Sequence, residues 1–138
     1  MRYPTLAASP HPPCDISSFS PPGVSLIDNM MLARFHKGPS ALTYYWFYRQ
    51  VKNRGPWDYK NNSGRKYENF GNFHYGAIGT AAGISSEALL RAAGLAQRIA
   101  GTSNDEFLSY FGPESHGDDP KDQTWIRAGI DYAVRAGF

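Results

Sequence analysis

The chain has few of the features that assign a protein to a class at once. It contains a single cysteine among 138 residues, so neither an intrachain disulfide nor a four-cysteine zinc site can form. It has no run of 18 or more apolar residues, which argues against a membrane-spanning helix. The first residues lack the continuous apolar segment of a signal peptide, so we expect none. The net charge is only +2, with both signs mixed along the chain, and does not indicate a nucleic-acid partner.

The composition of the chain favours one folded domain preceded by an N-terminal leader of different composition. A hydrophobic content of 41% and an aromatic content of 14% are typical of a protein with a packed core. Residues 1–24 hold six of the ten prolines, so we expect an extended linker or a leader laid on a surface. Residues 25–138 are then a single domain, which suits their length.

The pattern beyond residue 24 predicts a mainly α fold, a compact bundle of about five helices. Ser25 can cap the first helix, and Pro39 suits the start of the second, which runs through Leu42, Tyr45, Trp46, Tyr48 and Val51. No strand of period two is convincing, and one small β-hairpin at 57–68 is the only β-structure we consider, around a polar turn at 60–66. The predicted helices cover 25–35, 39–51, 86–100, 105–110 and a last segment that starts at 119–120.

Between residues 73 and 83 the chain is rich in glycine and alanine. Small side chains allow helices to approach closely, so a tightly packed central helix is one interpretation. A phosphate-binding loop is the alternative, but the spacing of Gly76, Gly79 and Gly83 matches neither standard phosphate motif.

Two carboxylates stand among aromatic residues and are candidates for acid–base chemistry. Asp58 follows the break at Gly55-Pro56, and Glu68 precedes a segment of amides and aromatic rings. Removal from water suits a carboxyl group for proton donation, and two carboxylates across a cleft can cleave a glycosidic bond. A capping role for Asp58, and an ion pair of Glu68 with a neighbouring base, are equally compatible with the pattern.

His74 is a third candidate, because a histidine can exchange protons near neutral pH. Paired with His116 it could support ribonuclease chemistry, although a hydrogen-bonded structural histidine is the commoner case. The four histidines show no metal-ligand spacing, so we expect no metal and no cofactor.

The acidic segment at 118–123 has a structural explanation for most of its members. Asp119 suits a helix N-cap, Pro120 a first helical residue and Asp122 a first-turn acid. Asp118 has no such explanation and is therefore the better functional candidate.

Several motifs, in this order, carry a resemblance to a known family. They are Trp46-Phe47-Tyr48, Gly55-Pro56-Trp57-Asp58-Tyr59-Lys60, Tyr67-Glu68-Asn69-Phe70-Gly71-Asn72-Phe73-His74-Tyr75-Gly76-Ala77-Ile78-Gly79 and Gly117-Asp118-Asp119-Pro120-Lys121-Asp122-Gln123. From about Ser25 to Phe138 the chain resembles the polymorphic toxin type 44 domain, also called bacterial toxin 44.

This resemblance implies a C-terminal antibacterial toxin domain of a larger secreted carrier, with a cognate immunity protein encoded beside it. The family pattern often has Asn at the position of His74, whereas Asp58, Glu68, Asp118 and Asp122 match it. The resemblance therefore favours hydrolysis assisted by carboxylates, with peptidoglycan glycan strands as the substrate.

Three hypotheses follow. The leading one is a cell-wall hydrolase, secreted or delivered into the periplasm of a target bacterium, with Glu68 as general acid and Asp58 or Asp118 as base or nucleophile. The second is a cytoplasmic ribonuclease in which His74 acts with a carboxylate and Lys60, Arg65 and Lys66 hold phosphate. The third is a non-enzymatic toxin that binds a membrane or a protein. The residues predicted to bind substrate are Trp57, Tyr59, Lys60, Asn69, Asn72, Tyr75 and Asp122.

Overall fold

The computed structural model describes residues 15–38, 41–52, 54–92 and 120–138. Within these ranges the chain is helical and contains no strand, which confirms the predicted mainly α fold. The helices are α1 (Leu26–Phe35), α2 (Ala41–Val51), α3 (Tyr59–Ser63), the 3₁₀ turn η1 (Arg65–Tyr67), α4 (Glu68–Ala81) and α7 (Pro120–Ala136), and residues 86–92 are also helical.

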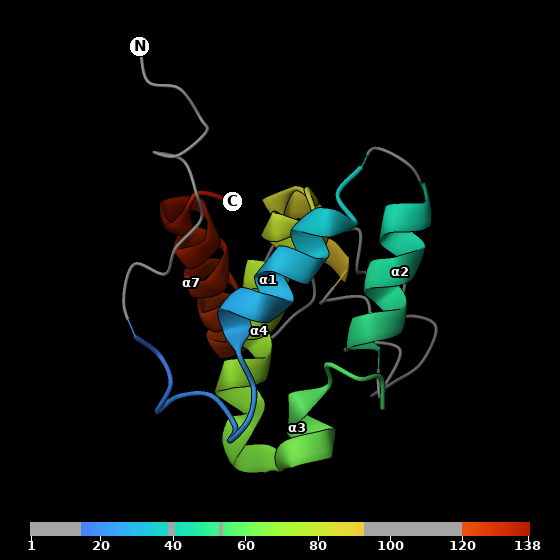
Figure 1. The fold of residues 1–138 in the computed structure, drawn as a ribbon. Coiled ribbons are helices and arrows are strands. Elements are labelled where there is room, and N and C mark those ends of the chain that lie inside the picture. Colours follow the sequence, from blue (N-terminus) through green and yellow to red (C-terminus); the bar gives the residue numbers. More distant parts are fainter. Residues whose placement is uncertain (1–14, 39–40, 53, 93–119) are drawn as a thin grey trace.

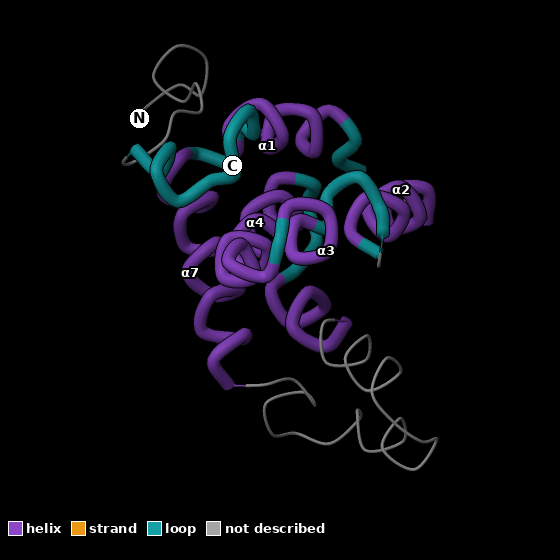
Figure 2. The backbone as a smooth tube through the Cα atoms, turned by 90° about the horizontal axis from the view of Figure 1, so that it is seen from below, coloured by secondary structure: helices purple, strands orange, loops and turns teal. Residues whose placement is uncertain are grey.

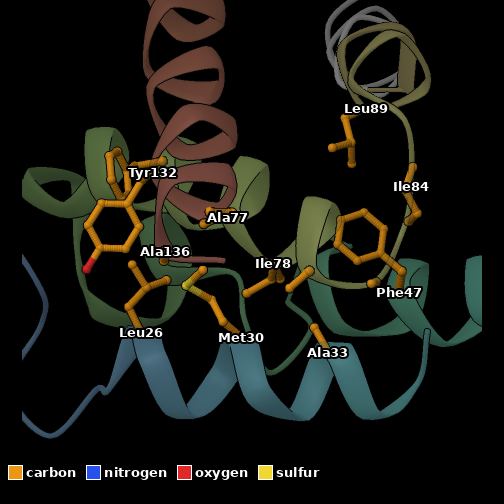
Figure 3. Close-up of a cluster of buried hydrophobic side chains, with 14 residues drawn as sticks. Leu26, Met30, Ala33, Phe47, Ala77, Ile78, Ile84, Leu89, Tyr132 and Ala136 are labelled. Carbon is orange, nitrogen blue, oxygen red and sulfur yellow. The ribbon is translucent and has the colours of Figure 1, made fainter. Parts of the chain in front are cut away.

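The central element is α4, which lies between α1 and α7 (Figure 1). Its side chains are buried over most of its length, so it packs against neighbours on more than one side. Figure 3 shows Leu26, Met30 and Ala33 of α1 directed toward Ala77 and Ile78 of α4. The core is therefore built around α4, as the small-residue segment predicted.

The α4–α7 contact is a contact between main chains. A Cβ atom added to Gly76 would lie 2.1 Å from the carbonyl oxygen of Ile126, and one added to Gly129 would lie 1.9 Å from that of Phe73. No side chain fits between the helices at these two positions, so glycine is required by space rather than by backbone angle. Gly76 and Gly129 fix how closely the two helices approach.

The start of α1 agrees with the prediction. The Ser25 hydroxyl accepts a hydrogen bond from the Asp28 backbone N–H at 3.2 Å, and this satisfies one of the free donors of the first turn. The Asp28 carboxylate also lies in that turn, where the helix dipole favours a negative charge.

We expect Ser25→Ala to lower the free energy of unfolding by about 1 kcal/mol, because a first-turn N–H loses its acceptor. Urea unfolding followed by circular dichroism measures the difference. Ser63→Ala, at an exposed position in α3, should change it by less than about 0.5 kcal/mol. Equal effects at the two serines would contradict the assigned cap.

The predicted hairpin at 57–68 is wrong, and so is the polar turn at 60–66. Both segments fold instead into α3 and η1. Asp58 caps α3, and Gly64, at φ +114°, ends it in a conformation that glycine adopts without strain. The turn residues of the pattern are thus used to separate two short helices.

The side of α2 that faces the core is narrow. Its buried residues are Thr43 and Phe47 only. Leu42, Tyr45 and Tyr48, which helped to predict the helix, are each more than half exposed. In two views α2 lies on the side of α4 opposite α7 (Figures 1 and 2).

The last residues of the predicted leader pack against the domain. The Phe19 ring contacts Phe70 and Phe73 of α4 edge-on at 5.5 and 5.6 Å and stacks on Trp125 of α7 at 5.2 Å. The division at residue 24 stays a prediction. The helix predicted at 86–100 begins at 86, while residues 93–100, the helix at 105–110, Asp118 and the Asp119 cap lie outside the described residues.

Candidate functional site

Two polar motifs that are about fifty residues apart in sequence meet in the structure. The Asn72 side-chain N–H donates a hydrogen bond to the Asp122 carboxylate at 3.1 Å, which joins α4 to the first turn of α7. The two helices run side by side in the same direction, because Asn72 meets Asp122 and Gly76, one turn later, meets Ile126. Their first turns therefore lie at one end of the molecule.

Glu68 and Asn69 belong to the same end. Glu68 lies in the first turn of α4, one helical turn before Asn72 and on the same face. Its side chain is 29% exposed and lies 3.7 Å from the far more exposed guanidinium of Arg65, a pair that contributes little to stability. We call Glu68, Asn69, Asn72 and Asp122 the polar end.

The Asn69 side chain has a buried carbonyl oxygen with no hydrogen-bond partner among the described residues. A buried acceptor without a partner costs about 1–3 kcal/mol, so such groups are rare in stable cores. This oxygen belongs to the residue that follows Glu68, so an unpaired buried acceptor lies next to the polar face of α4.

Asp58 lies elsewhere and acts as a cap. One carboxylate oxygen accepts from the Arg54 backbone N–H at 2.8 Å and from the Asn61 side chain, and the other from the Asn61 backbone N–H at 3.4 Å. These bonds begin α3 and hold Arg54 at φ +69°, where a non-glycine residue is strained. The structure thus favours the capping interpretation of Asp58.

His74 lies in the interior, 1% exposed. The Asn29 side-chain nitrogen lies 3.0 Å from the His74 Nε2 and 3.0 Å from the Tyr59 hydroxyl oxygen. Because an amide nitrogen only donates, Nε2 accepts, and the ring proton of the neutral histidine is on Nδ1. The rings of Trp57, Tyr59 and Phe70 surround the imidazole at centroid distances of 4.9–5.5 Å.

Burial lowers the pKa of His74 from 6.5 to about 3, because the charged imidazolium would lose its water without gaining a counter-ion. The histidine is therefore neutral at neutral pH. Burial likewise raises the pKa of the Tyr59 phenol. Both groups act as uncharged hydrogen-bond partners in a packed core.

The three aromatic residues predicted to bind substrate, Trp57, Tyr59 and Tyr75, pack in different places. Trp57 and Tyr59 pack on His74, whereas the Tyr75 ring packs on Phe47 and its hydroxyl donates to the Leu89 carbonyl at 2.5 Å. The Lys60 side chain and Asp118 lie outside the described residues. The structure brings predicted site residues together in two groups. His74, Trp57 and Tyr59 meet in the interior, and Glu68, Asn69, Asn72 and Asp122 lie at the polar end.

Asn29 is a residue that the sequence analysis missed. It has no motif around it, yet it joins Tyr59 and His74 across 30 and 45 residues of sequence. The available signal was its place in the helix, because Asn29 is three residues after Leu26 and four before Ala33, both buried. An amide on an apolar stripe predicts a buried polar partner.

Among the described residues, no three His, Cys, Asp or Glu side chains gather closely enough to hold a metal ion. The described helices also include none that is both long and apolar enough to cross a membrane.

Comparison with known proteins gives one match. The family described as bacterial toxin 44 matches residues 54–135, more than half of the chain and both polar motifs. No curated protein and no solved structure matches the chain.

Proposed function

Since the chain belongs to the bacterial toxin 44 family, we propose that it is a hydrolytic toxin domain that cleaves peptidoglycan glycan strands at the polar end. The observation that carries the proposal is the Asn72–Asp122 hydrogen bond, which brings the second acidic motif to the helix that bears Glu68. Two carboxyl groups and two amides at one end are the side chains that glycoside cleavage needs.

In this mechanism Glu68 is the general acid. Its carboxyl group donates a proton to the glycosidic oxygen as the bond from that oxygen to the anomeric carbon breaks. Partial exposure leaves Glu68 accessible to a polymer, and Arg65 lies on its outer side. Asp122 is the second carboxylate, and Asn72 orients it. It either activates a water molecule or bonds to the anomeric carbon.

We assign to Asp122 the role of base or nucleophile that was predicted for Asp58 or Asp118. Both oxygens of Asp58 accept hydrogen bonds from Asn61 of α3, and one also accepts from the Arg54 backbone N–H. That carboxylate is therefore used to cap α3.

The ribonuclease alternative rests on His74, and its surroundings argue against that role. Near neutral pH this imidazole is uncharged, so it cannot serve as the general acid. Its side chain is only 1% exposed, which also keeps it out of reach of a phosphodiester. Degraded RNA in arrested cells, before any loss of cell-wall integrity, would restore this alternative.

The proposed setting is interbacterial competition. The domain is carried by a larger secreted protein or a secretion apparatus into the periplasm of the target, and a cognate immunity protein protects the producer. A non-enzymatic toxin that binds a membrane or protein remains the third alternative, and toxicity that survives loss of both carboxylates would favour it.

We expect Glu68→Gln and Asp122→Asn each to lower the release of soluble fragments from purified peptidoglycan by about 10²–10⁴-fold, since each removes one acid–base group. Mass spectrometry of the fragments identifies the broken bond. The control is Glu87→Gln, because Glu87 is also a helical carboxylate paired with an arginine but is exposed and lies outside the polar end.

Expression in bacteria with and without a secretory signal completes the test. Lysis that needs both the signal and Glu68 supports the proposal. Full activity of Glu68→Gln on peptidoglycan, or arrest that is equal without the signal, would exclude it.

A further inference from the structure

The outer face of α2 exposes an unusual number of large side chains. Leu42 is 76% exposed, Tyr45 59% and Tyr48 60%, and Tyr44 on the same helix is 50% exposed. Single exposed apolar residues need no explanation, but four large ones on one eleven-residue helix do, and we call them the apolar patch of α2. Thr43 and Phe47 are the buried residues of α2, and Trp46 and Val51 also pack against the core, so the four exposed side chains occupy the part of the helix that faces outward.

A basic hollow adjoins this patch. It has a volume of about 480 Å³ and lies between α2 and the turn at 54–56, with Leu42 and Tyr45 on its wall. Arg49, Lys52 and Arg54 also line it, and no described residue of its lining is acidic. The apolar patch and the three cations therefore belong to one surface, which we call the α2 surface.

The α2 surface is held in a fixed shape. The Arg49 guanidinium lies over the Tyr45 ring, 5.8 Å from its centre, and the His36 ring stacks on Trp46 at 4.0 Å. The Asp58 carboxylate accepts from the Arg54 backbone N–H and holds the turn that forms the far wall. A surface that is ordered before binding loses less conformational entropy when a partner docks.

We propose that the α2 surface docks a protein whose contact face is acidic, and that this protein neutralises the toxin. Tyrosine, tryptophan and arginine are the residues most enriched where protein interfaces gain their energy. Three cations without a carboxylate among them select an acidic partner. RNA would use the cations and rings, but it gives no role to Leu42, the most exposed large hydrophobic side chain of α2.

The docking site is separate from the polar end. The α2 surface lies on the side of α4 opposite α7, and its lining shares no residue with the polar end (Figure 1). The proposed docking site therefore does not include Glu68 or Asp122. The inference rests on membership of the toxin family and not on which bond the toxin cleaves.

The test measures binding to the purified product of the reading frame next to the toxin's own. The toxin chain is made by cell-free synthesis, so that its production does not depend on its activity. Arg49→Glu and Leu42→Asp should each weaken binding, measured by titration calorimetry, by at least about 30-fold, the effect of losing an interface hot spot. Both positions are outside the buried core, so folding is preserved.

Two control variants should bind as tightly as the unchanged chain. Arg127→Glu makes the same charge reversal at an exposed position of α7, and Glu68→Gln removes the proposed acid at the polar end. In co-expression, Arg49→Glu should stay toxic and escape neutralisation. This readout holds whether the toxin cleaves peptidoglycan or another target.

Equal affinity of the two α2 variants and the unchanged chain would overturn the inference, as would no binding of the neighbouring product at all. A short single-stranded RNA is titrated in parallel. If Arg49→Glu abolishes RNA binding while the neighbouring product binds both variants normally, the surface serves nucleic acid and the inference fails.

Discussion

Gly129→Ala is expected to lower the free energy of unfolding by about 4 kcal/mol or more, enough to unfold much of the protein. The added methyl group would lie 1.9 Å from the Phe73 carbonyl oxygen. The neighbour is backbone inside α4, so it cannot rotate away, and the helices must separate along their whole contact. Separation would also open the core shared with Tyr132 and Ala133.

Urea unfolding followed by circular dichroism measures this effect. The matched control is Gly38→Ala, where the new Cβ would lie 3.4 Å from the Thr43 hydroxyl oxygen, an ordinary contact. This control should change the free energy of unfolding by less than about 1 kcal/mol. If Gly129→Ala were as mild as Gly38→Ala, the two helices would not be in main-chain contact.

His74 should make the protein lose stability in mild acid. Its pKa is about 3 in the folded protein and near 6.5 when unfolded, so the unfolded chain binds the proton more tightly. Stability from the neutral histidine is complete above about pH 6.5 and falls as pH decreases toward about 3. Between about pH 7 and pH 4.5 the free energy of unfolding should fall by about 2–3 kcal/mol from this group alone.

The matched variant is His74→Asn, which keeps a polar side chain near Asn29 but does not titrate. Urea unfolding of both proteins at the two pH values gives the difference in pH dependence. Both proteins have the same carboxylates, so this difference comes from His74. The variant should lose about 2–3 kcal/mol less than the unchanged chain over this interval. Identical pH dependence would mean that His74 is not buried as a neutral group.

Local signals predicted much of the fold. Ser25 caps α1, α7 begins at Pro120, and the Gly55-Pro56 break lies in the segment between α2 and α3. The hairpin at 57–68 failed because polar and glycine residues suit a turn between strands as well as one between short helices. The Asp58 cap decided between them, and it requires the helical geometry of Asn61.

The candidate site was predicted only in part, for a different reason. Asp122 was explained as a first-turn acid, and the sequence contains nothing that joins it to Asn72, because that contact depends on how α4 and α7 cross. The burial of His74 is likewise a tertiary property, set by Asn29 and three aromatic rings from separate segments. Residue type identified the candidates, and packing decided their roles.

The contact at Gly76 and Gly129 has a consequence for how such a toxin can evolve. The distance between α4 and α7, the two helices that carry the polar end, is set by contact between their main chains. It does not depend on which side chains cover the rest of the molecule. Substitutions on the exposed side of α2 leave that spacing unchanged, since these side chains do not lie between α4 and α7. A lineage can therefore alter the face that an inhibitor recognises while its catalytic groups stay in register.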